Sequence, residues 1–551
     1  MREWIDGEMI RPQVDALAVA KRWTIPNLTA FYESRQPVIW LLAMLVGLAT
    51  GIAAVLFRLA IGLVQWPWLR DFGENVAAAA AAQPWWVILI APATGGLLVG
   101  LMLQYVLTAK RTGAVADVME ARIHSGRGLG FRQGLANALA SVLSLGSGAS
   151  AGREGPVVHL GASLAAFVCV RMRLPNSARR TLLACGVAGA VSASFNAPIA
   201  GVLFAQEVIL GHFAARSLAP LVLASASATI VSRFWFGDTV AFTVPEYTII
   251  SYLEVPAFFL LGAIAALVAI VFQVALIGTD WVARNIPMPL VIRPVIGGLM
   301  VGAIAIWFPQ VLGVGYDTTD AALKDSLPIT LLLALIVAKV AATSITIASR
   351  FGGGVFSPAL CIGALTGAAY GAIAAGVFPD LSSSGGLYAI LGMGAVAAAV
   401  LGAPISTTVM VFELTGGYAL SLALLMTVSI ASGLSHAVLG RSYFHAQLES
   451  RGIVLQEGFH RVLVRQVHVS DFMTPISEGE ESTLEPDTAE YVLRPGDTLE
   501  TALRLFDTAG AERLPVVGPD DRTILVGWAR QVRALSWFNK ALIETSVEEH
   551  R

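Results

Sequence analysis

Long apolar stretches separated by short polar connections dominate the first 448 residues of the chain. Apolar runs begin near Pro37, Trp85, Phe131, Thr181, Leu218, Val255, Val291, Leu327, Leu387 and Ala419. Several reach the roughly 20 residues that a helix needs to cross the ~30 Å hydrocarbon core of a bilayer. From Glu449 onward no run of that length occurs, and charged residues become common. The pattern predicts a polytopic helical membrane part followed by a small soluble part.

Several apolar runs are short and interrupted by Gly or Pro. These interruptions fall at Gly152–Pro156, Asn196–Pro198, Gly352–Pro358 and Gly402–Pro404. Lipid offers no hydrogen-bond partner to a free backbone group, so broken helices occur at membrane depth only where they are buried in protein or line a cavity. The breaks therefore predict a pathway inside the protein.

The interruptions also occur twice in the same order. Residues 196–207 (NAPIAGVLFAQE) resemble residues 402–413 (GAPISTTVMVFE), and in both segments a Glu follows the first Ala by ten residues. A Gly-rich break that ends in Pro precedes each segment at a similar distance. Two matched landmarks predict an internal duplication, and paired broken segments in transporters mark a binding site at the interface of the repeats.

Composition supports the membrane assignment and excludes other classes. Hydrophobic residues make up 56% of the chain and charged residues only 13%, whereas roughly 25% of the residues of a soluble domain are charged. The net charge of −2 gives no reason to expect a nucleic-acid partner. Cys169, Cys185 and Cys361 lie in apolar segments without metal-ligand spacing, so we expect core residues, no metal and no cofactor.

The segment Gly152–Pro156 (GREGP) carries the candidate chemistry. A carboxylate inside the membrane is costly and marks a functional site by default. Glycine lets backbone N–H groups approach a ligand, and Pro156 is expected to open a helix, whose N-terminus attracts anions. A carboxylate at an anion site competes with the anion, which makes Glu154 a candidate gate. The alternative is a structural Arg153–Glu154 pair.

Four segments together resemble the CLC family of chloride channels and proton/chloride antiporters. They are GREGP at residues 152–156, FNAPIAGVLF at 195–204, GGGVFSP at 352–358 and GAPISTTVMVFELTGG at 402–417. The resemblance spans roughly residues 37–452. It implies an all-α inverted-repeat fold of tilted, broken helices, in a homodimer whose subunits each have a pore. Residues 497–535 resemble a CBS domain, a small α/β cytoplasmic unit.

The expected organisation follows from these two resemblances. It comprises a cytoplasmic N-terminal segment (1–36), a first membrane repeat (37–240), a second membrane repeat (241–448) and a cytoplasmic CBS-like domain (449–551). We expect a multi-pass protein of a prokaryotic inner membrane with both termini in the cytoplasm.

The resemblance also implies a set of site residues. Glu154 is the expected gate, and the expected anion-binding positions are Gly113, Arg153, Gly155, Val355, Phe356 and Phe444. The family's Ser and Tyr hydroxyls align with Gly113 and Phe444, which removes both side-chain donors. A hydrogen bond to a charged group contributes ~1.5–3 kcal/mol, so we expect weaker, less selective anion binding. A one-residue shift would instead bring in the hydroxyl of Thr112 or Tyr443.

The family's inner proton-transfer Glu aligns with Val208, directly after Glu207. Valine there is the channel-like pattern, so we favour passive conduction. The alternative is a proton/chloride antiporter with a nonstandard proton route. We expect Glu207 and Glu413 to be structural carboxylates at helix ends. Lys110 and Arg111 either concentrate anions at the inner entrance or reflect the positive-inside bias.

The remaining expectations concern partners and enzyme activity. A membrane enzyme is a remote alternative, because the sequence lacks a metal-ligand cluster, a nucleophile–base set and a cofactor motif, so no enzymatic activity is expected. The expected partners are chloride or other small anions, protons as a coupled or gating ion, a second copy and the lipid membrane. In the tail, Arg530 and Arg533 stand where nucleotide-binding CBS domains carry Ser/Thr and Asp, which argues against adenine-nucleotide binding in the usual mode.

Overall fold

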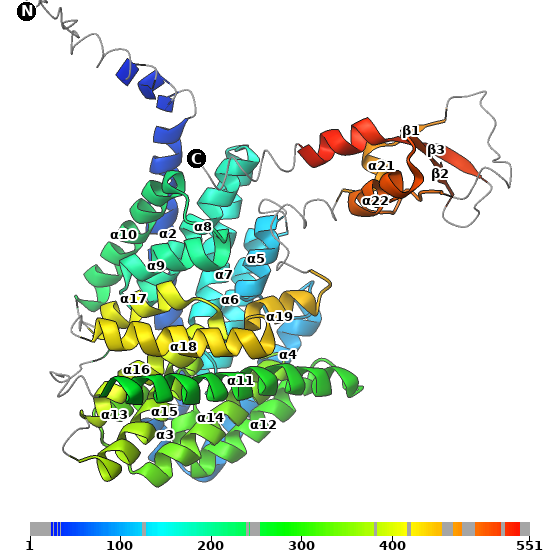
Figure 1. Ribbon diagram of the computed structural model, residues 1–551. Helices are drawn as coiled ribbons and strands as arrows, with labels where there is room; N and C mark the ends of the chain where they lie inside the picture. Colours follow the sequence, from blue (N-terminus) through cyan, green and yellow to red (C-terminus); the bar gives the residue numbers. More distant parts are fainter. Residues whose placement is uncertain are drawn as a thin grey trace, which may run out of the picture.

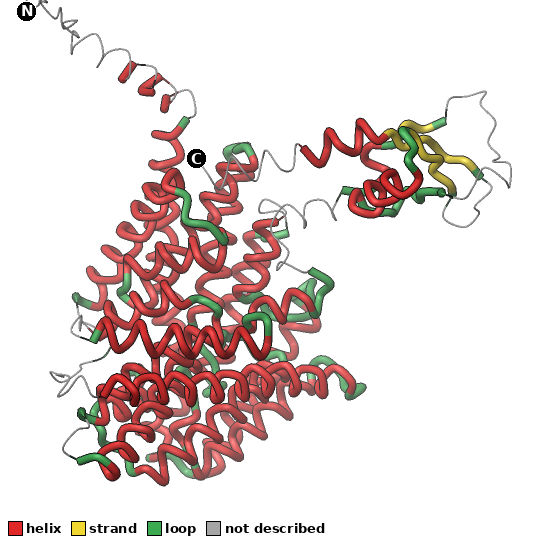
Figure 2. The backbone as a smooth tube through the Cα atoms, in the orientation of Figure 1, coloured by secondary structure: helices red, strands yellow, loops and turns green. Residues whose placement is uncertain are grey.

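The computed structural model describes residues 24–25, 27–29, 31–32, 35–123, 128–238, 242, 254–379, 383–415, 420–453, 467–476, 491–518 and 524–539. These residues form a large helical part and a small α/β unit near the C-terminus (Figures 1 and 2). Most of the predicted N-terminal segment 1–36 lies outside them.

The described part of the first repeat consists of helices. They are α2 (Gln36–Leu69), α3 (Val76–Ala81), α4 (Trp85–Tyr105), α5 (Val115–Ile123), α6 (Phe131–Gly146), α7 (Glu154–Arg171), α8 (Asn176–Phe195), α9 (Pro198–Phe204), the π-helical turn η1 (Ala205–Leu210) and α10 (Ala215–Phe236).

The second repeat has a similar order of long and short helices, except that its described residues contain no counterpart of α3 and form the turn η3 before its first short helix. It contains α11 (Val255–Asn285), α12 (Ile292–Trp307), the 3₁₀ turn η3 (Pro309–Val311), α13 (Tyr316–Leu323), α14 (Ile329–Ala348), α15 (Phe356–Val377), α16 (Gly385–Leu401), α17 (Pro404–Thr415) and α18 (Ser421–Leu439), and α19 (Tyr443–Glu449) follows it. Among the described helices, seven are long and apolar enough to cross a membrane. The predicted all-α polytopic membrane fold is confirmed.

The centre of the helical part is built from small residues. Every residue of α16 is buried, and its sequence, GGLYAILGMGAVAAAVL, is rich in Gly and Ala. Small side chains let helix backbones approach closely, which drives helix packing in membranes. The peripheral helix α2 instead alternates buried positions such as Ala43 and Val46 with exposed ones such as Leu41 and Leu45. Its exposed side chains suit a lipid environment.

Matching close contacts inside the two halves confirm the predicted duplication. Helix α7 packs along α8, and α15 packs along α16. A Cβ at Gly161 of α7 would lie 2.4 Å from the Gly186 carbonyl oxygen of α8. A Cβ at Gly363 of α15 would lie 2.4 Å from the Gly392 carbonyl oxygen of α16. The same backbone-to-backbone contact therefore occurs at equivalent positions of both repeats.

Reciprocal contacts between the halves show that they are related by an approximate two-fold axis. A Cβ at Gly96 of α4 would lie 2.3 Å from the Pro294 carbonyl oxygen of α12. A Cβ at Gly298 of α12 would lie 2.3 Å from the Pro92 carbonyl oxygen of α4. Such mutual exchange of equivalent residues is the mark of an isologous contact. The inverted-repeat architecture is thus present within one chain.

The four predicted helix breaks lie at helix boundaries. Asn196 and Gly402 end α8 and α16 in the left-handed region, with φ of 56° and 68°, and α9 and α17 begin two residues later. Left-handed φ is readily adopted by Gly and tolerated by Asn. One expectation needs correction: α7 begins at Glu154 and not at Pro156. Proline is tolerated there because first-turn amides have no intrahelical acceptor.

The C-terminal unit is a three-stranded antiparallel sheet with helices. Its strands are β1 (Thr474–Pro475), β2 (Arg513–Val517) and β3 (Leu525–Arg530), in the order β1-β3-β2. Helices α21 (Val469–Phe472) and α22 (Leu499–Ala509) share one apolar core with the sheet. The small α/β unit suits a CBS-like domain, whose identity stays a prediction.

The close glycine contacts give a direct test of the duplicated packing. Gly161→Ala and Gly363→Ala should each lower thermal stability in detergent, because inserting a methyl group into a tightly packed core costs ~1–3 kcal/mol. Gly278→Ala in α11 is the matched control, since a Cβ there meets nothing within 4 Å. Equal melting temperatures for all three variants and the parent protein would contradict the described helix contacts.

Candidate functional site

The starts of α7 and α15 meet at the centre of the helical part. Gly152, just before α7, and Gly354, just before α15, form an antiparallel backbone bridge. The Gly152 N–H donates to the Gly354 carbonyl at 2.6 Å, and the Gly354 N–H donates to the Gly152 carbonyl at 2.7 Å. Two helix N-termini, one from each repeat, are thereby held side by side.

The first amides of α15 are available to a ligand. Val355 is the N-cap of this helix and makes no side-chain capping bond. The amides of Val355, Phe356 and Ser357 have no hydrogen-bond acceptor within the described part of the chain. Helix N-termini carry a partial positive charge of roughly +0.5, and buried amides need acceptors. Val355 and Phe356, two of the expected anion-binding residues, thus lie at a helix start that is suited to an anion.

Glu154 is fully buried beside these amides, with 1% of its surface exposed. Its Oε1 accepts hydrogen bonds from Ser357 Oγ at 2.5 Å and from Tyr316 Oη at 3.2 Å. Its Oε2 has no partner within the described residues. Ser357 belongs to α15 and Tyr316 is the first residue of α13, so two elements of the second repeat hold the carboxylate of the first.

Arg153 forms its ion pair with another carboxylate. Its guanidinium binds Glu74, which also forms an ion pair with Arg58 at 3.0 Å. Arg153 Nη2 donates to the Ser194 carbonyl at 3.2 Å, and its guanidinium lies 4.8 Å from the centre of the Tyr316 ring. Glu154 Oε1 lies 4.0 Å from Arg153 Nε, at the limit of an ion pair. The alternative of a structural Arg153–Glu154 pair therefore fits the geometry poorly.

A cavity of about 450 Å³, here called cavity A, leads to the helix starts. Its wall includes the predicted residues Lys110, Arg111, Thr112, Gly155, Val355, Phe356, Tyr443 and Phe444. Arg284, Arg350 and Arg451 also line it, against the carboxylates of Asp117 and Asp280. Cations outnumber carboxylates on this wall, so the cavity favours anions.

A second cavity of about 180 Å³, here called cavity B, lies close to Glu154. Arg58, Glu74, Arg153 and Tyr316 line it. The residues on either side of Glu154 face different cavities, because Arg153 lines cavity B and Gly155 lines cavity A. The Glu154 carboxylate is bonded to Tyr316, which lines cavity B, and to Ser357, which directly follows the cavity A residue Phe356.

Gly113 does not line cavity A. It lines a separate cavity of about 250 Å³ together with Asn137 and His159. Its N–H donates to Asn137 Oδ1 at 3.0 Å, and a Cβ there would lie 2.4 Å from His159 Nε2. The buried His159 ring thus fills the space that a serine side chain would need. Sequence reasoning missed His159, whose signal is a polar residue within the apolar stretch of α7.

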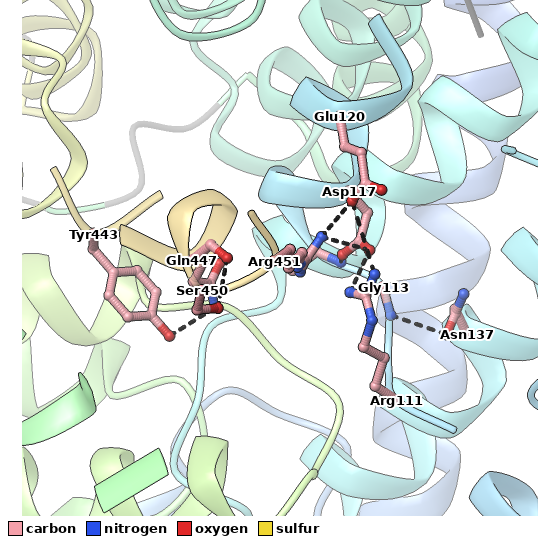
Figure 3. Close-up of polar contacts among 10 residues, drawn as sticks. Arg111, Gly113, Asp117, Glu120, Asn137, Tyr443, Gln447, Ser450 and Arg451 are labelled. Atoms are coloured by element: carbon pink, nitrogen blue, oxygen red, sulfur yellow. Dashed lines mark hydrogen bonds and ion pairs between the residues drawn. The ribbon is translucent and has the colours of Figure 1, made fainter. Parts of the chain in front are cut away.

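Two further predicted contacts lie on the wall of cavity A with their hydroxyls already engaged. Thr112 Oγ1 donates to the Phe351 carbonyl at 3.2 Å. The Tyr443 hydroxyl accepts from Gln447 Nε2 at 2.8 Å, within α19 (Figure 3). Phe444 brings a phenyl ring and no donor. The Thr112 hydroxyl hydrogen is therefore committed to a backbone carbonyl, whereas the Tyr443 oxygen only accepts and its O–H stays a predicted donor to an anion.

A group of ion pairs fixes this wall (Figure 3). Arg451, just after α19, pairs with Asp117 at 3.1 Å and Glu120 at 2.8 Å, both on α5. Arg111 also binds Asp117. These charges tie α19 to α5 and to the loop that carries Thr112. The sequence could not reveal them, because more than 330 residues separate Arg451 from its partners.

Glu207 and Glu413 cap broken helices of the opposite repeat. Glu207 accepts from the amides of Ile405 at 3.1 Å and Ser406 at 2.7 Å, in the first turn of α17. Glu413 accepts from Ile199 at 3.0 Å and Ala200 at 2.7 Å, in the first turn of α9. Their predicted structural role at helix ends is confirmed.

Val208 lies next to Glu207 in η1. It is buried and absent from the residues that line cavity A. A valine side chain can neither accept nor release a proton. The position that the family resemblance assigns to proton transfer is therefore apolar here.

Comparisons with known proteins agree with this architecture. Residues 95–436 match a family model described as voltage gated chloride channel. A ClcB-like chloride channel protein of Ralstonia nicotianae is 34% identical over 400 residues, 72% of this chain and 93% of the relative. The voltage-gated ClC-type chloride channel ClcB of Escherichia coli is 32% identical over 402 residues, 72% and 96% of the two chains. A solved slow cyanobacterial Cl⁻/H⁺ antiporter superposes with a TM-score of 0.67 at 23% identity, covering 75% and 97%.

The reciprocal caps can be tested by removing each carboxylate. Glu207→Ala and Glu413→Ala should each lower the free energy of unfolding by about 2 kcal/mol, since hydrogen bonds to charged groups contribute ~1.5–3 kcal/mol. Asp320→Ala is the control, because its i,i+4 pair with Lys324 is partly exposed and such pairs contribute ~0.3–0.5 kcal/mol. Thermal unfolding in detergent measures the difference, and equal losses in all three variants would argue against the caps.

Proposed function

The chain belongs to the CLC family of chloride channels and transporters, and from this premise we propose that it conducts chloride passively along a path gated by Glu154. Its broader activity is CLC-type chloride transport through the membrane as an integral multi-pass protein. The observation that carries the proposal is the buried Glu154 carboxylate, held by Tyr316 of cavity B and by Ser357, which follows Phe356 of cavity A, near amides that have no acceptor among the described residues.

The proposed path uses partial charges in place of a trapping cation. Chloride enters cavity A, where the surplus of arginine and lysine raises its local concentration. It then reaches the amides of Val355 and Phe356. These amides stabilise an anion, and binding that is favourable but weak permits release. Chloride can therefore leave these amides without breaking an ion pair to a full positive charge.

Glu154 acts as the gate in this proposal because its carboxylate competes with chloride for the same amides. When ionised it closes the proposed path. Protonation, or displacement by chloride, removes the competing negative charge and lets the side chain leave the path. Flux is therefore expected to rise as pH falls.

The missing side-chain donors set the character of the anion site. His159 takes the space beside Gly113, and Phe444 presents a ring where the family presents a hydroxyl. Anion binding in the path is then left to backbone amides. We propose that chloride binds weakly and that other small anions of similar size also pass.

The second candidate is proton/chloride exchange, which is favoured by the likeness to a protein named as a Cl⁻/H⁺ antiporter. Val208 argues against it, because a proton that reaches Glu154 from the cavity A side would need another carrier. We also propose a homodimer with cytoplasmic termini in a prokaryotic inner membrane, and no enzymatic turnover.

The tail is proposed as a CBS-like regulatory or dimerisation unit. Arg530 ends β3 with an exposed side chain, and Arg533 Nη1 donates to Thr474 Oγ1 at 3.2 Å. A guanidinium cannot accept a hydrogen bond from a ribose hydroxyl. Adenine-nucleotide binding in the usual mode is therefore not part of the proposal.

Replacing the gate tests the proposal directly. In liposomes, chloride flux through the parent protein should increase at least several-fold between pH 7.5 and pH 4.5, because protonation removes the competing charge. Glu154→Gln and Glu154→Ala should give high flux that no longer depends on pH. Flux that keeps the parent's pH dependence in both variants would rule out the gate.

The same liposomes separate the two candidate functions. An outward chloride gradient should move no protons uphill if conduction is passive, as a pH electrode would record. Stoichiometric proton uptake driven by chloride would replace the channel proposal with the antiporter.

A restored hydroxyl tests the weak anion site. Phe444→Tyr should tighten chloride binding roughly 10- to 150-fold, the equivalent of the ~1.5–3 kcal/mol of a charge-assisted hydrogen bond. Tyr443→Phe is the comparison variant, because it removes the hydroxyl that a one-residue shift of the alignment would make the anion donor. Calorimetric titration with chloride measures both. Weaker chloride binding in Tyr443→Phe than in the parent protein, together with unchanged binding in Phe444→Tyr, would show that Tyr443 is the anion contact.

A further inference from the structure

Two hydroxyl groups from the second repeat converge on one oxygen of Glu154. Ser357 Oγ lies 2.5 Å and Tyr316 Oη 3.2 Å from Oε1. We propose that Tyr316 and Ser357 form a latch that holds the Glu154 carboxylate in the closed position. The proposal rests on the proposed role of Glu154 as the gate and assigns two positioning residues to it.

The Tyr316 ring is fixed in place before its hydroxyl reaches Glu154. Its ring packs edge-on against Phe242, with centroids 5.5 Å apart, and the Arg153 guanidinium covers it at 4.8 Å. Tyr316 begins α13 directly after Gly315, which has a left-handed φ of 91°. A side chain whose ring is already packed loses little further entropy when its hydroxyl bonds the carboxylate. Tyr316 is thus a preorganised donor.

Ser357 supplies the second donor from the helix that presents the anion-binding amides. It is buried, with 2% of its surface exposed, and stands in the first turn of α15 directly after Phe356. The latch and the anion site are therefore built on one rigid turn. A carboxylate held by Ser357 is held beside the amides of Val355 and Phe356.

The two oxygens of Glu154 differ in their surroundings. Oε1 takes both hydroxyl donors, whereas Oε2 has no partner among the described residues. Oε2 lies against Gly152, where an added Cβ would come within 2.6 Å of it. Oε1 therefore anchors the side chain, and Oε2 is the oxygen left for a proton or for competition with chloride.

The charged groups near Glu154 are paired with one another, so the hydroxyls of Tyr316 and Ser357 are the main contacts of the Glu154 carboxylate. Arg153 of the α7 N-cap reaches Oε1 only at 4.0 Å and is bound to Glu74. Glu74 in turn binds Arg58 of α2. On the α13 and α15 sides, Tyr316 and Ser357 face the carboxylate. Removing either hydroxyl should leave these ion pairs intact while loosening the gate.

The latch is tested by measuring chloride flux through single variants, made both in the parent protein and in a Glu154→Ala background. Tyr316→Phe and Ser357→Ala should each raise flux at pH 7.5, by up to about tenfold for a hydrogen bond worth ~1.4 kcal/mol. Each should also move the pH of half-maximal flux upward, because a less firmly held carboxylate leaves the path at a lower proton concentration. In a Glu154→Ala background neither change should alter flux. That dependence on Glu154 is what a merely structural role would not produce.

Matched controls remove a hydroxyl elsewhere. Tyr370→Phe loses a 3.0 Å bond to the Ala257 carbonyl, and Ser232→Ala loses a 2.9 Å bond to the Ala193 carbonyl. Both should conduct like the parent protein. If Tyr316→Phe folds poorly, Ser357→Ala carries the test, with the amount of folded protein measured by size-exclusion chromatography.

The possible failures are distinguishable. High flux in Glu154→Ala with parent-like Tyr316→Phe and Ser357→Ala would overturn the latch and leave the gate. Parent-like flux and pH dependence in Glu154→Ala would overturn the gate and the latch together. An increase of flux by Tyr316→Phe that persists in the Glu154→Ala background would show that the hydroxyl narrows the path itself, which also overturns the latch.

Discussion

Two backbone hydrogen bonds between Gly152 and Gly354 join the repeats at the point where each begins its central helix. Because these glycines use their amides and carbonyls on each other, the next amides along α15 remain for a ligand. The same contact brings Ser357 of one repeat against Glu154 of the other. The proposed anion site and its proposed gate therefore depend on a pairing between two segments that neither repeat completes alone.

A membrane interior explains why the pairing extends to every broken helix. Water is not available there to satisfy an exposed amide, so each interrupted helix needs an acceptor from the protein. Glu207 and Glu413 meet that need across the repeat boundary. Both carboxylates lie within apolar segments of the sequence, where a proton carrier could also stand. Each of them, however, already accepts hydrogen bonds from two backbone amides. Glu154 differs from them because hydroxyl groups hold it, and hydroxyl bonds can be exchanged without unfolding a helix.

The sequence predicted the long elements and the breaks well, because lipid imposes length and apolarity on each spanning helix and backbone satisfaction on each break. Through the family resemblance it also pointed to Val355 and Phe356 as candidate anion contacts and to Glu154 as the candidate gate. It missed the partners of that carboxylate, since Tyr316 lies 162 residues away and has no periodic signal. Gly113 illustrates the same limit. The sequence shows that this position has no side chain, but only the packed structure shows that the His159 ring occupies the space.

The reciprocal caps carry a consequence for how the protein is made. The amide of Ala200 leaves the ribosome 213 residues before its acceptor, Glu413. At ~5–20 residues per second, α9 waits on the order of 10–40 s for its cap. During that interval the first amides of α9 lack this acceptor, and lipid offers none in its place. The chain's symmetry thus sets a delay in its own biogenesis, which only synthesis of the second repeat brings to an end.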